Sequence, residues 1–459
     1  MARRCAAAAL AAVLACAVPA GALAQETSFA DPPPVDMSKP VPSSAIPDAT
    51  HTQKTACVTD LPRDVDIKGA PWGQDRLQFD ELRKFATGKN VTVAVIDTGV
   101  TSHQWLKGRV SGAGDYIQKG GDGLSDCDGH GTVVAGIIAA KPPSDVGFRG
   151  IAPDARILSI RQSSTFFERE TTDGGKEPAG TLATLASAIV RAVEQDADVV
   201  NMSVNRCRPS GPITEDEKVL QRALRFAHDK GVVLVTSAGN VNEDRCKESA
   251  NGFDPNNPTN IVTPPWFDEY VLSVGAMDRN GDPAAFTVQG PWVGVSAPGT
   301  EITSLNPAGD GLANQRATAN GDRAPIEGTS FAAPYVAGLA ALVKERYPEL
   351  TARQVMDRIK LTAAHPAAHG GRDNLVGYGM VNPVSALTAM IPAEQGVEPA
   401  VSEDVRMAMP PAVPEDLTPM RVALIGAGGG VLLLLVTLFV VHTVRRNRPE
   451  LRSDPRGQA

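Results

Sequence analysis

Residues 91–99 read Val-Thr-Val-Ala-Val-Ile-Asp-Thr-Gly, a short apolar run that ends in a polar turn. Three further runs of the same kind follow along the chain, at 197–202, 232–235 and 270–274. Amphipathic stretches, such as 182–194 and 217–229, separate these runs. Apolar strands buried on both faces and alternating with helices are typical of a parallel sheet covered on both sides. The pattern therefore predicts an α/β fold, a doubly wound parallel sheet with helices on both faces.

Functional residues in a doubly wound sheet gather at the carboxyl ends of the strands. The run at 91–96 is followed by Asp97, Thr98 and Gly99, so Asp97 is expected at this edge. Asp-Thr-Gly also marks aspartic proteases, which need two such carboxylates sharing one proton. The chain has one copy, and taken alone this copy could be a simple turn at a strand end.

A histidine occupies a second turn, bounded by glycines. His130 lies in Asp-Cys-Asp-Gly-His-Gly-Thr-Val-Val-Ala-Gly at 126–136, a turn that leads into an apolar helix. Small neighbours allow its imidazole to stand at a helix start, close to other backbone. We interpret the six other histidines as structural: His51, His103, His228, His365, His369 and His442.

A serine begins a third motif, Gly-Thr-Ser-Phe-Ala-Ala-Pro at 328–334, which opens a helix rich in alanine, valine and leucine. Serine at a helix N-terminus is often only a cap. We expect Pro334 in the first turn, where proline is tolerated because the N–H groups there lack helical partners. The hydroxyl and amide of Ser330 would then lie at the positive end of the helix, which suits a developing oxyanion.

Asn240 follows the run at 232–235 and is expected at the same edge, where its side chain could donate to a tetrahedral intermediate beside the Ser330 amide. In such an arrangement His130 accepts the proton of Ser330, and Asp97 orients the imidazole and stabilises its charged form. The chain order Asp, His, Ser is that of subtilisin and differs from those of chymotrypsin and the α/β-hydrolases. Together the four motifs predict a serine endopeptidase.

The N-terminus has the pattern of a secretory signal peptide, which we assign to residues 1–24. Arg3 and Arg4 precede an apolar run, and Ala-Leu-Ala at 22–24 offers a cleavage site with small residues. The run is shorter than the roughly 20 apolar residues that a membrane-spanning helix needs. An alternative makes Cys16 a lipoprotein cysteine, since Ala15 precedes it, although Leu14 is bulky for that recognition.

Residues 422–441 carry no charge and are followed by Arg445, Arg446 and Arg448. A helix of this length spans about 30 Å, the thickness of the hydrocarbon core. The arginines place the tail at 442–459 in the cytoplasm. We therefore expect a single-pass protein of the cell membrane with its catalytic domain, 72–391, outside the cytoplasm. A proline-rich acidic linker at 392–421 would join the domain to the membrane.

Charge and cysteine content narrow the remaining classes. The net charge is −8 with no basic stripe, so we expect no nucleic-acid partner. Removal of the signal peptide leaves an even number of cysteines in an oxidising compartment, with three possible pairings: Cys57, Cys127, Cys207 and Cys246. None of their spacings is a C-x-x-C pair. We assign no metal and no cofactor, and find no ligand loop for calcium.

At these motifs the chain resembles the subtilisin-like serine proteases, and more narrowly the mycosins, the membrane-anchored proteases of actinobacterial type VII secretion systems. The more specific marks are Ser-Ile-Arg-Gln-Ser-Ser at 159–164, Gly-Pro-Trp-Val at 290–293, Ala-Pro-Gly at 297–299 and Gly-Tyr-Gly at 377–379. The resemblance runs from about Trp72 through the apolar segment at 422–441. It implies a subtilisin-like fold, selective cleavage of a secreted protein substrate, and association with the membrane complex of the secretion system.

Subtilisins usually carry a folded inhibitory propeptide before the block at Trp72. Residues 25–71 are instead proline-rich and without periodicity, which predicts an extended segment lying on the domain. This N-terminal extension is similar to that of mycosins, wrapped around the domain. On this resemblance we expect Cys57 to pin the extension to Cys127, near His130. Cys207 and Cys246 then form the second pair, because they follow two strands whose ends, at 203–205 and 237–240, should be neighbours.

Ser203, Val204 and Asn205 follow the run at 197–202, and we expect them to bind an extended substrate by strand addition. The alternative is a plain strand end in the core. Two other functions stay open. The chain could be a structural subunit of the secretion complex whose proteolysis is dispensable, or a soluble degradative protease released by cleavage in the linker.

Overall fold

The computed structural model describes residues 29–59, 68–171, 174–241, 246, 257–317, 323–397 and 417–447. The chain divides into two compact units, residues 1–397 and residues 398–459. The assigned signal peptide at 1–24 lies outside the described residues, as do most of the linker at 392–421 and most of the tail at 442–459.

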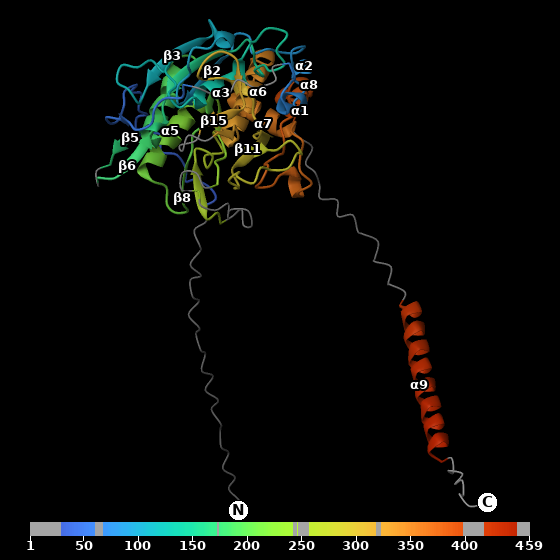
Figure 1. Cartoon of the computed structure of the whole chain (residues 1–459). Helices are drawn as coiled ribbons and strands as arrows, with labels where there is room; N and C mark the ends of the chain where they lie inside the picture. The colour runs from blue at the N-terminus through green and yellow to red at the C-terminus, as the bar shows by residue number, and fades with distance from the viewer. Residues whose placement is uncertain are drawn as a thin grey trace, which may run out of the picture. The chain divides into compact units, whose positions relative to one another are not determined.

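A seven-stranded sheet forms the centre of the first unit (Figure 1), in the order β12-β11-β9-β7-β2-β4-β3. All of its neighbouring strands are parallel. Its strands are β2 (Thr92–Asp97), β3 (Val110–Asp115), β4 (Arg156–Arg161), β7 (Val199–Met202), β9 (Val233–Ser237), β11 (Val271–Met277) and β12 (Val293–Pro298). The four apolar runs of the sequence are β2, β7, β9 and β11, and every residue in them is buried. The predicted doubly wound parallel sheet is confirmed.

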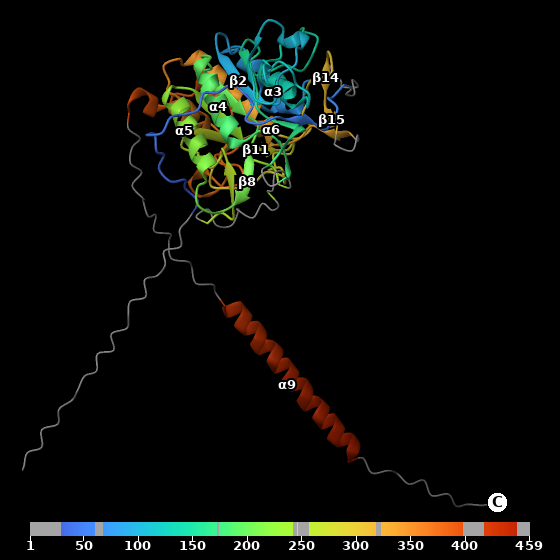
Figure 2. The same cartoon turned by 90° about the vertical axis from the view of Figure 1, so that its left-hand side faces the viewer.

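Helices cover both faces of this sheet. Val93 and Val95 of β2 pack in one apolar cluster with α3 (His130–Ala139) and α6 (Thr329–Arg346). Ala94 and Ile96 pack in a second cluster with α4 (Leu182–Glu194) and α5 (Glu215–Asp229). This alternation follows from the two-residue period of a strand. Figure 2 shows α4 and α5 lying side by side.

Smaller elements surround the sheet. The antiparallel pairs are β8 (Arg206–Pro209) with β10 (Asn260–Thr263), β13 (Ser304–Leu305) with β14 (Leu312–Ala313), and β15 (Gln315–Ala317) with β16 (Arg323–Pro325). The remaining helices of the first unit are α1 (Trp72–Arg76), α2 (Phe79–Leu82), α7 (Ala352–Leu361) and α8 (Pro383–Thr388). Short 3₁₀ turns occupy Gln104–Leu106, His369–Gly371 and Pro392–Gln395.

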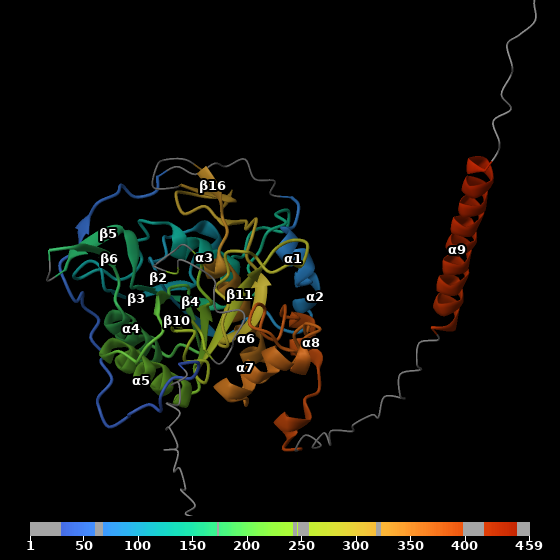
Figure 3. The same ribbon diagram turned by 90° about the horizontal axis from the view of Figure 1, so that it is seen from below.

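The N-terminal extension follows the edge of the domain over residues 29–59 (Figure 3). The Trp266 indole N–H donates to the carbonyl oxygens of Phe29 and Ala30, both at 3.1 Å. Further along, β1 (Thr52–Gln53) pairs antiparallel with β5 (Ser164–Glu170), which also pairs with β6 (Lys176–Ala179). These residues are extended and lie against the domain, as the sequence pattern predicts.

Two disulfides join Cys57 to Cys127 and Cys207 to Cys246, the pairs that the resemblance implied. Beside the first, the Val58 N–H donates to the Cys127 carbonyl at 2.9 Å. The extension is therefore covalently attached three residues before His130.

The second unit contains α9 (Thr418–Arg446), which is longer at both ends than the segment 422–441. Within the described part of the chain it is the one helix long and apolar enough to cross a membrane. Its apolar side chains are exposed, and Arg445 and Arg446 lie in its last turn.

Candidate active site

The carboxyl end of β2 and the start of α3 bring Asp97 and His130 together. The Nδ1 atom of His130 lies 2.7 Å from Oδ1 of Asp97, which also accepts a hydrogen bond from the Thr98 N–H at 2.7 Å. Asp97 is fully buried. The approach of the two elements requires glycine, because a Cβ on Gly131 would lie 2.1 Å from the Gly99 carbonyl oxygen. The two glycine-bounded turns of the sequence are thus in direct contact.

Asp97 also sets the proton affinity of His130. Burial disfavours the charged imidazole, whereas the charge of Asp97 and its hydrogen bond favour it. The carboxylates of Asp126 and Asp128 act in the same direction, so the pKa of His130 is raised above its ordinary value. Asp97 therefore favours the imidazolium form, as required of the third member of a catalytic triad.

Ser330 lies in the first turn of α6, beside the end of β7. Its hydroxyl donates to the carbonyl oxygen of Ser203 at 3.2 Å, and the Ser203 hydroxyl donates back to the Ser330 carbonyl at 2.7 Å. The ring centroids of His130 and Phe331, the next residue of α6, lie 4.9 Å apart. The serine and histidine motifs are therefore neighbours, with the Ser330 hydroxyl turned toward Ser203.

Pro334 does not lie in the first turn of α6, where the sequence placed it. The helix begins at Thr329, so Pro334 falls in the second turn. A residue there would normally donate its N–H to the carbonyl four residues earlier, which is that of Ser330. Proline lacks this N–H, and the Ser203 hydroxyl is the donor that satisfies the Ser330 carbonyl. The Ser203 hydroxyl therefore replaces the helical hydrogen bond that Pro334 cannot make.

Asn240 lies after β9 and packs against the start of α6. Its Oδ1 accepts hydrogen bonds from the N–H and the hydroxyl of Thr329, both at 3.0 Å. The Thr329 hydroxyl in turn accepts from the Gly239 N–H at 3.2 Å. With Oδ1 engaged on the helix, Nδ2 is the group that Asn240 can present as a donor. It lies 3.4 Å from the position that a Cβ on Gly328 would occupy.

Asp126 is a site residue that the sequence reasoning missed. Its buried carboxylate accepts from the Thr98 hydroxyl and Gly129 N–H at 2.8 Å, and from the N–H and hydroxyl of Thr132 at 2.8 and 2.6 Å. Burial raises its pKa to about 6, although these hydrogen bonds oppose the shift. Asp126 ties the turn after β2 to the first turn of α3. Asp126 lies four residues before the start of α3, whose N-cap is Gly129, so the usual capping pattern did not reveal it.

Asp128 is the second missed residue, and it links the His130 turn to β5. Its carboxylate accepts from the Ser164 hydroxyl at 2.5 Å, and from the N–H and hydroxyl of Thr165 at 2.7 and 2.8 Å. Because β5 also pairs with β1, the extension and the histidine turn are attached to the same strand. Contacts between segments so far apart in the chain leave no local pattern.

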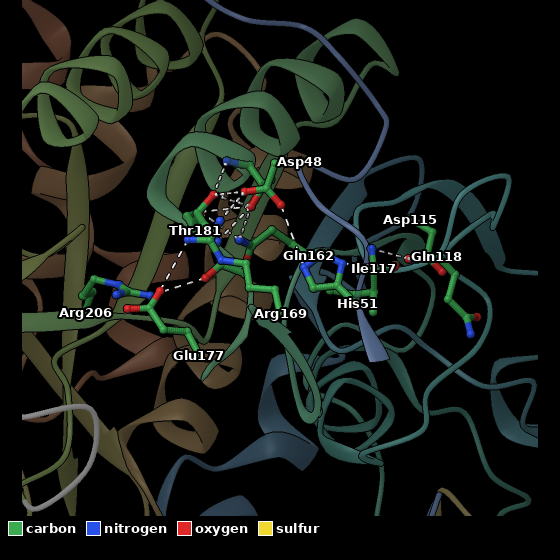
Figure 4. Close-up of polar contacts among 12 residues, drawn as sticks. Asp48, His51, Asp115, Ile117, Gln118, Gln162, Arg169, Glu177, Thr181 and Arg206 are labelled. Atoms are coloured by element: carbon green, nitrogen blue, oxygen red, sulfur yellow. Dashed lines mark hydrogen bonds and ion pairs between the residues drawn. The ribbon is translucent and has the colours of Figure 1, made fainter. Parts of the chain in front are cut away.

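The extension also joins a cluster of charged groups beside α4, shown in Figure 4. Thr181, which caps α4, donates its hydroxyl to Asp48 at 3.0 Å. Arg169 lies 3.7 Å from Asp48 and 3.4 Å from Glu177. His51 has Nδ1 3.2 Å from the Ile117 carbonyl oxygen, which agrees with a structural histidine.

The three residues expected to bind substrate, 203–205, connect the end of β7 to the start of β8. Ser203 contacts Ser330 as described, and the Asn205 amide donates to the Ser237 hydroxyl at 3.1 Å. Val204 packs against the apolar cluster on the α4 side of the sheet. In the described residues no group of three or more His, Cys, Asp or Glu side chains could hold a metal ion.

Comparison with known proteins identifies the class. The model of the subtilase family matches residues 88–379, which include all four motifs. The chain therefore belongs to the subtilase family of serine endopeptidases.

Relatives within that family include several mycosins. Mycosin-1 of Mycolicibacterium smegmatis is 41% identical over 79% of this chain and 82% of its own length. Mycosin-4 of Mycobacterium tuberculosis is 40% identical over 91% and 92%. The crystal structure of MycP1 from the ESX-1 type VII secretion system superimposes with a TM-score of 0.73, at 39% identity over 79% of this chain and 97% of that one. The chain is a mycosin by these measures.

A similar chain is also present in a larger assembly. It occurs in the structure of an intact ESX-5 inner membrane complex, with a TM-score of 0.73 and 37% identity over 90% of this chain and 100% of that one.

Proposed function

We propose that Ser330, His130 and Asp97 are the catalytic triad of this endopeptidase and that Asn240 completes its oxyanion hole. The observation that carries the proposal is the 2.7 Å contact between His130 Nδ1 and the buried Asp97 carboxylate. This contact leaves Nε2 of His130 as the ring nitrogen for Ser330. Rotation about the Ser330 Cα–Cβ bond moves the hydroxyl from the Ser203 carbonyl toward His130, and such bonds are often misaligned in free enzymes.

The mechanism follows from these positions. His130 accepts the Ser330 proton as Oγ attacks the scissile carbonyl carbon, and Asp97 stabilises the resulting imidazolium. Asn240 Nδ2 and the Ser330 N–H donate to the oxyanion. The proton then passes from His130 to the leaving amine, which departs and leaves an acyl-enzyme on Ser330. Water, deprotonated by His130, hydrolyses this ester and restores the free serine.

The setting of the reaction is the second part of the proposal. The helix α9 anchors the catalytic domain, 72–391, on the extracytoplasmic side, with residues 442–459 in the cytoplasm. Residues 1–24 act as the export signal and 392–421 as the linker. The match to a chain in the ESX-5 inner membrane complex supports association with a type VII secretion complex and processing of a substrate that it exports.

The same match favours a second candidate function, that of a structural subunit of the complex. In that case deletion of the protein would abolish secretion, and Ser330→Ala would leave secretion unchanged. If processing is the essential role, both changes abolish or alter it. Comparing the secreted proteins of the two strains by mass spectrometry separates the candidates.

The chemistry is tested on the full-length protein in detergent. A fluorophosphonate probe should label the wild type on Ser330 and should fail to label Ser330→Ala. Peptide cleavage should fall by several orders of magnitude in Ser330→Ala and in His130→Ala. Labelling at another serine, or cleavage that persists in Ser330→Ala, would contradict the assigned nucleophile.

A further inference from the structure

One buried carboxylate, that of Asp126, joins the turn after β2 to the start of α3. Its Oδ1 accepts hydrogen bonds from the Thr98 hydroxyl and the Gly129 N–H, both at 2.8 Å. Its Oδ2 accepts from the N–H and the hydroxyl of Thr132, at 2.8 and 2.6 Å. Each oxygen therefore faces two donors, which suits an ionised carboxylate, because that group can only accept.

Both hydroxyls bonded to Asp126 extend the link to the backbone of the opposite turn. The Thr98 hydroxyl accepts from the Gly131 N–H of α3 at 2.9 Å. The Thr132 hydroxyl accepts from the Thr101 N–H, in the turn after β2, at 2.9 Å. A hydroxyl has one proton to donate, and both hydroxyls donate it to Asp126. The carboxylate therefore fixes the orientation of two cross-links between the turns.

We propose that Asp126 is a positioning residue, which holds His130 against Asp97 while it is ionised and lets the two turns separate when it gains a proton. This inference rests on the proposed endopeptidase function and adds its regulation by pH. A protonated Asp126 carries an O–H on one oxygen, and that oxygen faces two donors where it needs an acceptor. One of the two sides of the link must then open, so the start of α3 is no longer fixed to the turn after β2.

The surroundings of Asp126 favour this proton at moderately acidic pH. Burial raises its pKa to about 6, the charge of Asp97 adds to the shift, and the hydrogen bonds that the carboxylate accepts oppose it. The other titratable groups at these turns are His130 and Asp128, whose carboxylate is bonded to β5. Because the pKa is raised, the folded state binds the proton more readily than the unfolded chain does. Protonation of Asp126 therefore acts on activity and does not by itself lower the stability of the fold.

Two protons then limit hydrolysis in acid. His130 gains its proton first, because its pKa is raised above the ordinary value, and Asp126 follows near pH 6. The logarithm of kcat/KM should therefore rise with a slope of about two at the acid end of the profile and about one closer to the His130 midpoint. A single titrating histidine would give a slope of about one throughout.

Peptide hydrolysis by the full-length protein in detergent, from about pH 4.5 to 9, tests the proposal. Asp126→Asn places an amide N–H₂ against the same donors and resembles the protonated acid. We expect its kcat to fall by about 10²-fold, as for a misplaced catalytic group, with KM nearly unchanged and an acid slope of about one. A wild-type slope of one, or wild-type kcat in Asp126→Asn, would overturn the proposal.

Asp115→Asn is the matched control. Asp115 is a buried aspartate in the turn after β3, where its Oδ1 accepts from the N–H groups of Ile117 and Gln118 at 2.7 and 2.8 Å. The same change there should leave kcat and the acid slope of about two as in the wild type. Loss of kcat in this control equal to that in Asp126→Asn would mean that any buried aspartate of these turns has the same effect, which contradicts a specific role for Asp126.

A spectroscopic measurement follows the position of His130 without chemistry. In Ser330→Ala labelled with ¹⁵N-histidine, the Nδ1 proton shared with Asp97 gives its own NMR signal. We expect this signal to disappear below about pH 6 and to be absent at every pH when Asp126→Asn is added. A signal that persists to pH ~5 would refute the proposal, even if Asp126→Asn fails to fold. Disappearance below pH ~6 together with a wild type that cleaves nothing at any pH would refute the endopeptidase function and leave the positioning role standing.

Discussion

At the scale of single residues, the proposed role of His130 as general base makes activity depend on its charge state. His130 must be neutral to accept the Ser330 proton, and its pKa is raised chiefly because Asp97 stabilises the imidazolium against the opposing effect of burial. Because the pKa is raised, His130 remains in the imidazolium form, which cannot accept a proton, up to a higher pH. We therefore expect kcat/KM to rise with pH and to reach half of its plateau above pH ~6.5, the ordinary value for histidine. Peptide hydrolysis measured from about pH 5 to 9 checks this.

Replacement of Asp97 by asparagine provides the control for that profile. Burial of His130 persists but the attracting charge is gone, so the midpoint should move to lower pH while the plateau falls steeply. In chymotrypsin-type enzymes the same change costs about 10⁴ in kcat, largely through the wrong imidazole tautomer. A midpoint that stays in place in Asp97→Asn would show that another group sets the profile.

Asn240 allows a second prediction at this scale. Loss of its amide removes one of the two proposed donors to the oxyanion. The oxyanion exists only after attack, so kcat should fall while KM changes little. In subtilisin itself removal of one such donor costs about 10²–10³ in kcat, and we expect Asn240→Ala to fall in that range. Steady-state kinetics on a short peptide substrate measures it. A loss confined to KM would indicate a role in substrate binding instead.

At the scale of secondary structure, the approach of α3 to the turn after β2 holds Asp97 and His130 in contact. A methyl group on Gly131 would lie 2.1 Å from the Gly99 carbonyl, so Gly131→Ala must push the helix start away from the turn. We expect loss of most activity and a lower unfolding temperature, by a ΔΔG of about 1–3 kcal/mol for an overpacked contact.

Gly211→Ala is the matched control for that change. The nearest atom to a Cβ there is Arg208 Nη1 at 3.7 Å, and Gly211 lies outside the site. The activity and the unfolding temperature of Gly211→Ala should both remain near those of the wild type. Full activity in Gly131→Ala would mean that α3 can move away from the turn after β2 without disturbing the contact between Asp97 and His130.

Elements with a local signal could be predicted from the sequence. Asp97 and Asn240 are each close to the end of an apolar run, and His130 starts a helix, so parallel topology alone brings them to one edge. Pro334 was placed wrongly because the helix already begins at Thr329, which puts Pro334 in the second turn. The reciprocal bonds of Ser203 with Ser330 could not be foreseen, since they join residues far apart in the chain and depend on that helix start. The same holds for Trp266 and the carbonyl of Phe29.

At the scale of the whole molecule, the groups proposed for catalysis and the attachment to the membrane lie in different units. The triad, Asn240 and Asn205 all lie within residues 1–397, and α9 lies in 398–459. A long apolar helix inserts almost irreversibly, far more firmly than a peripheral contact. Attachment should therefore restrict which substrates the enzyme meets without taking part in bond cleavage.

Truncation after residue 397 tests this separation. The exported ectodomain should move from the membrane to the soluble fraction, because the helix that spans the bilayer is gone. Its kcat/KM on short peptides should stay within about twofold of the full-length enzyme, since every proposed catalytic group remains. Processing of the natural secreted substrate in cells should fall, because the protease is no longer held beside the export complex. Removal of residues 448–459 alone keeps α9 and should preserve membrane attachment. An ectodomain that stays membrane-bound, or that loses peptide hydrolysis, would show that the two units depend on each other.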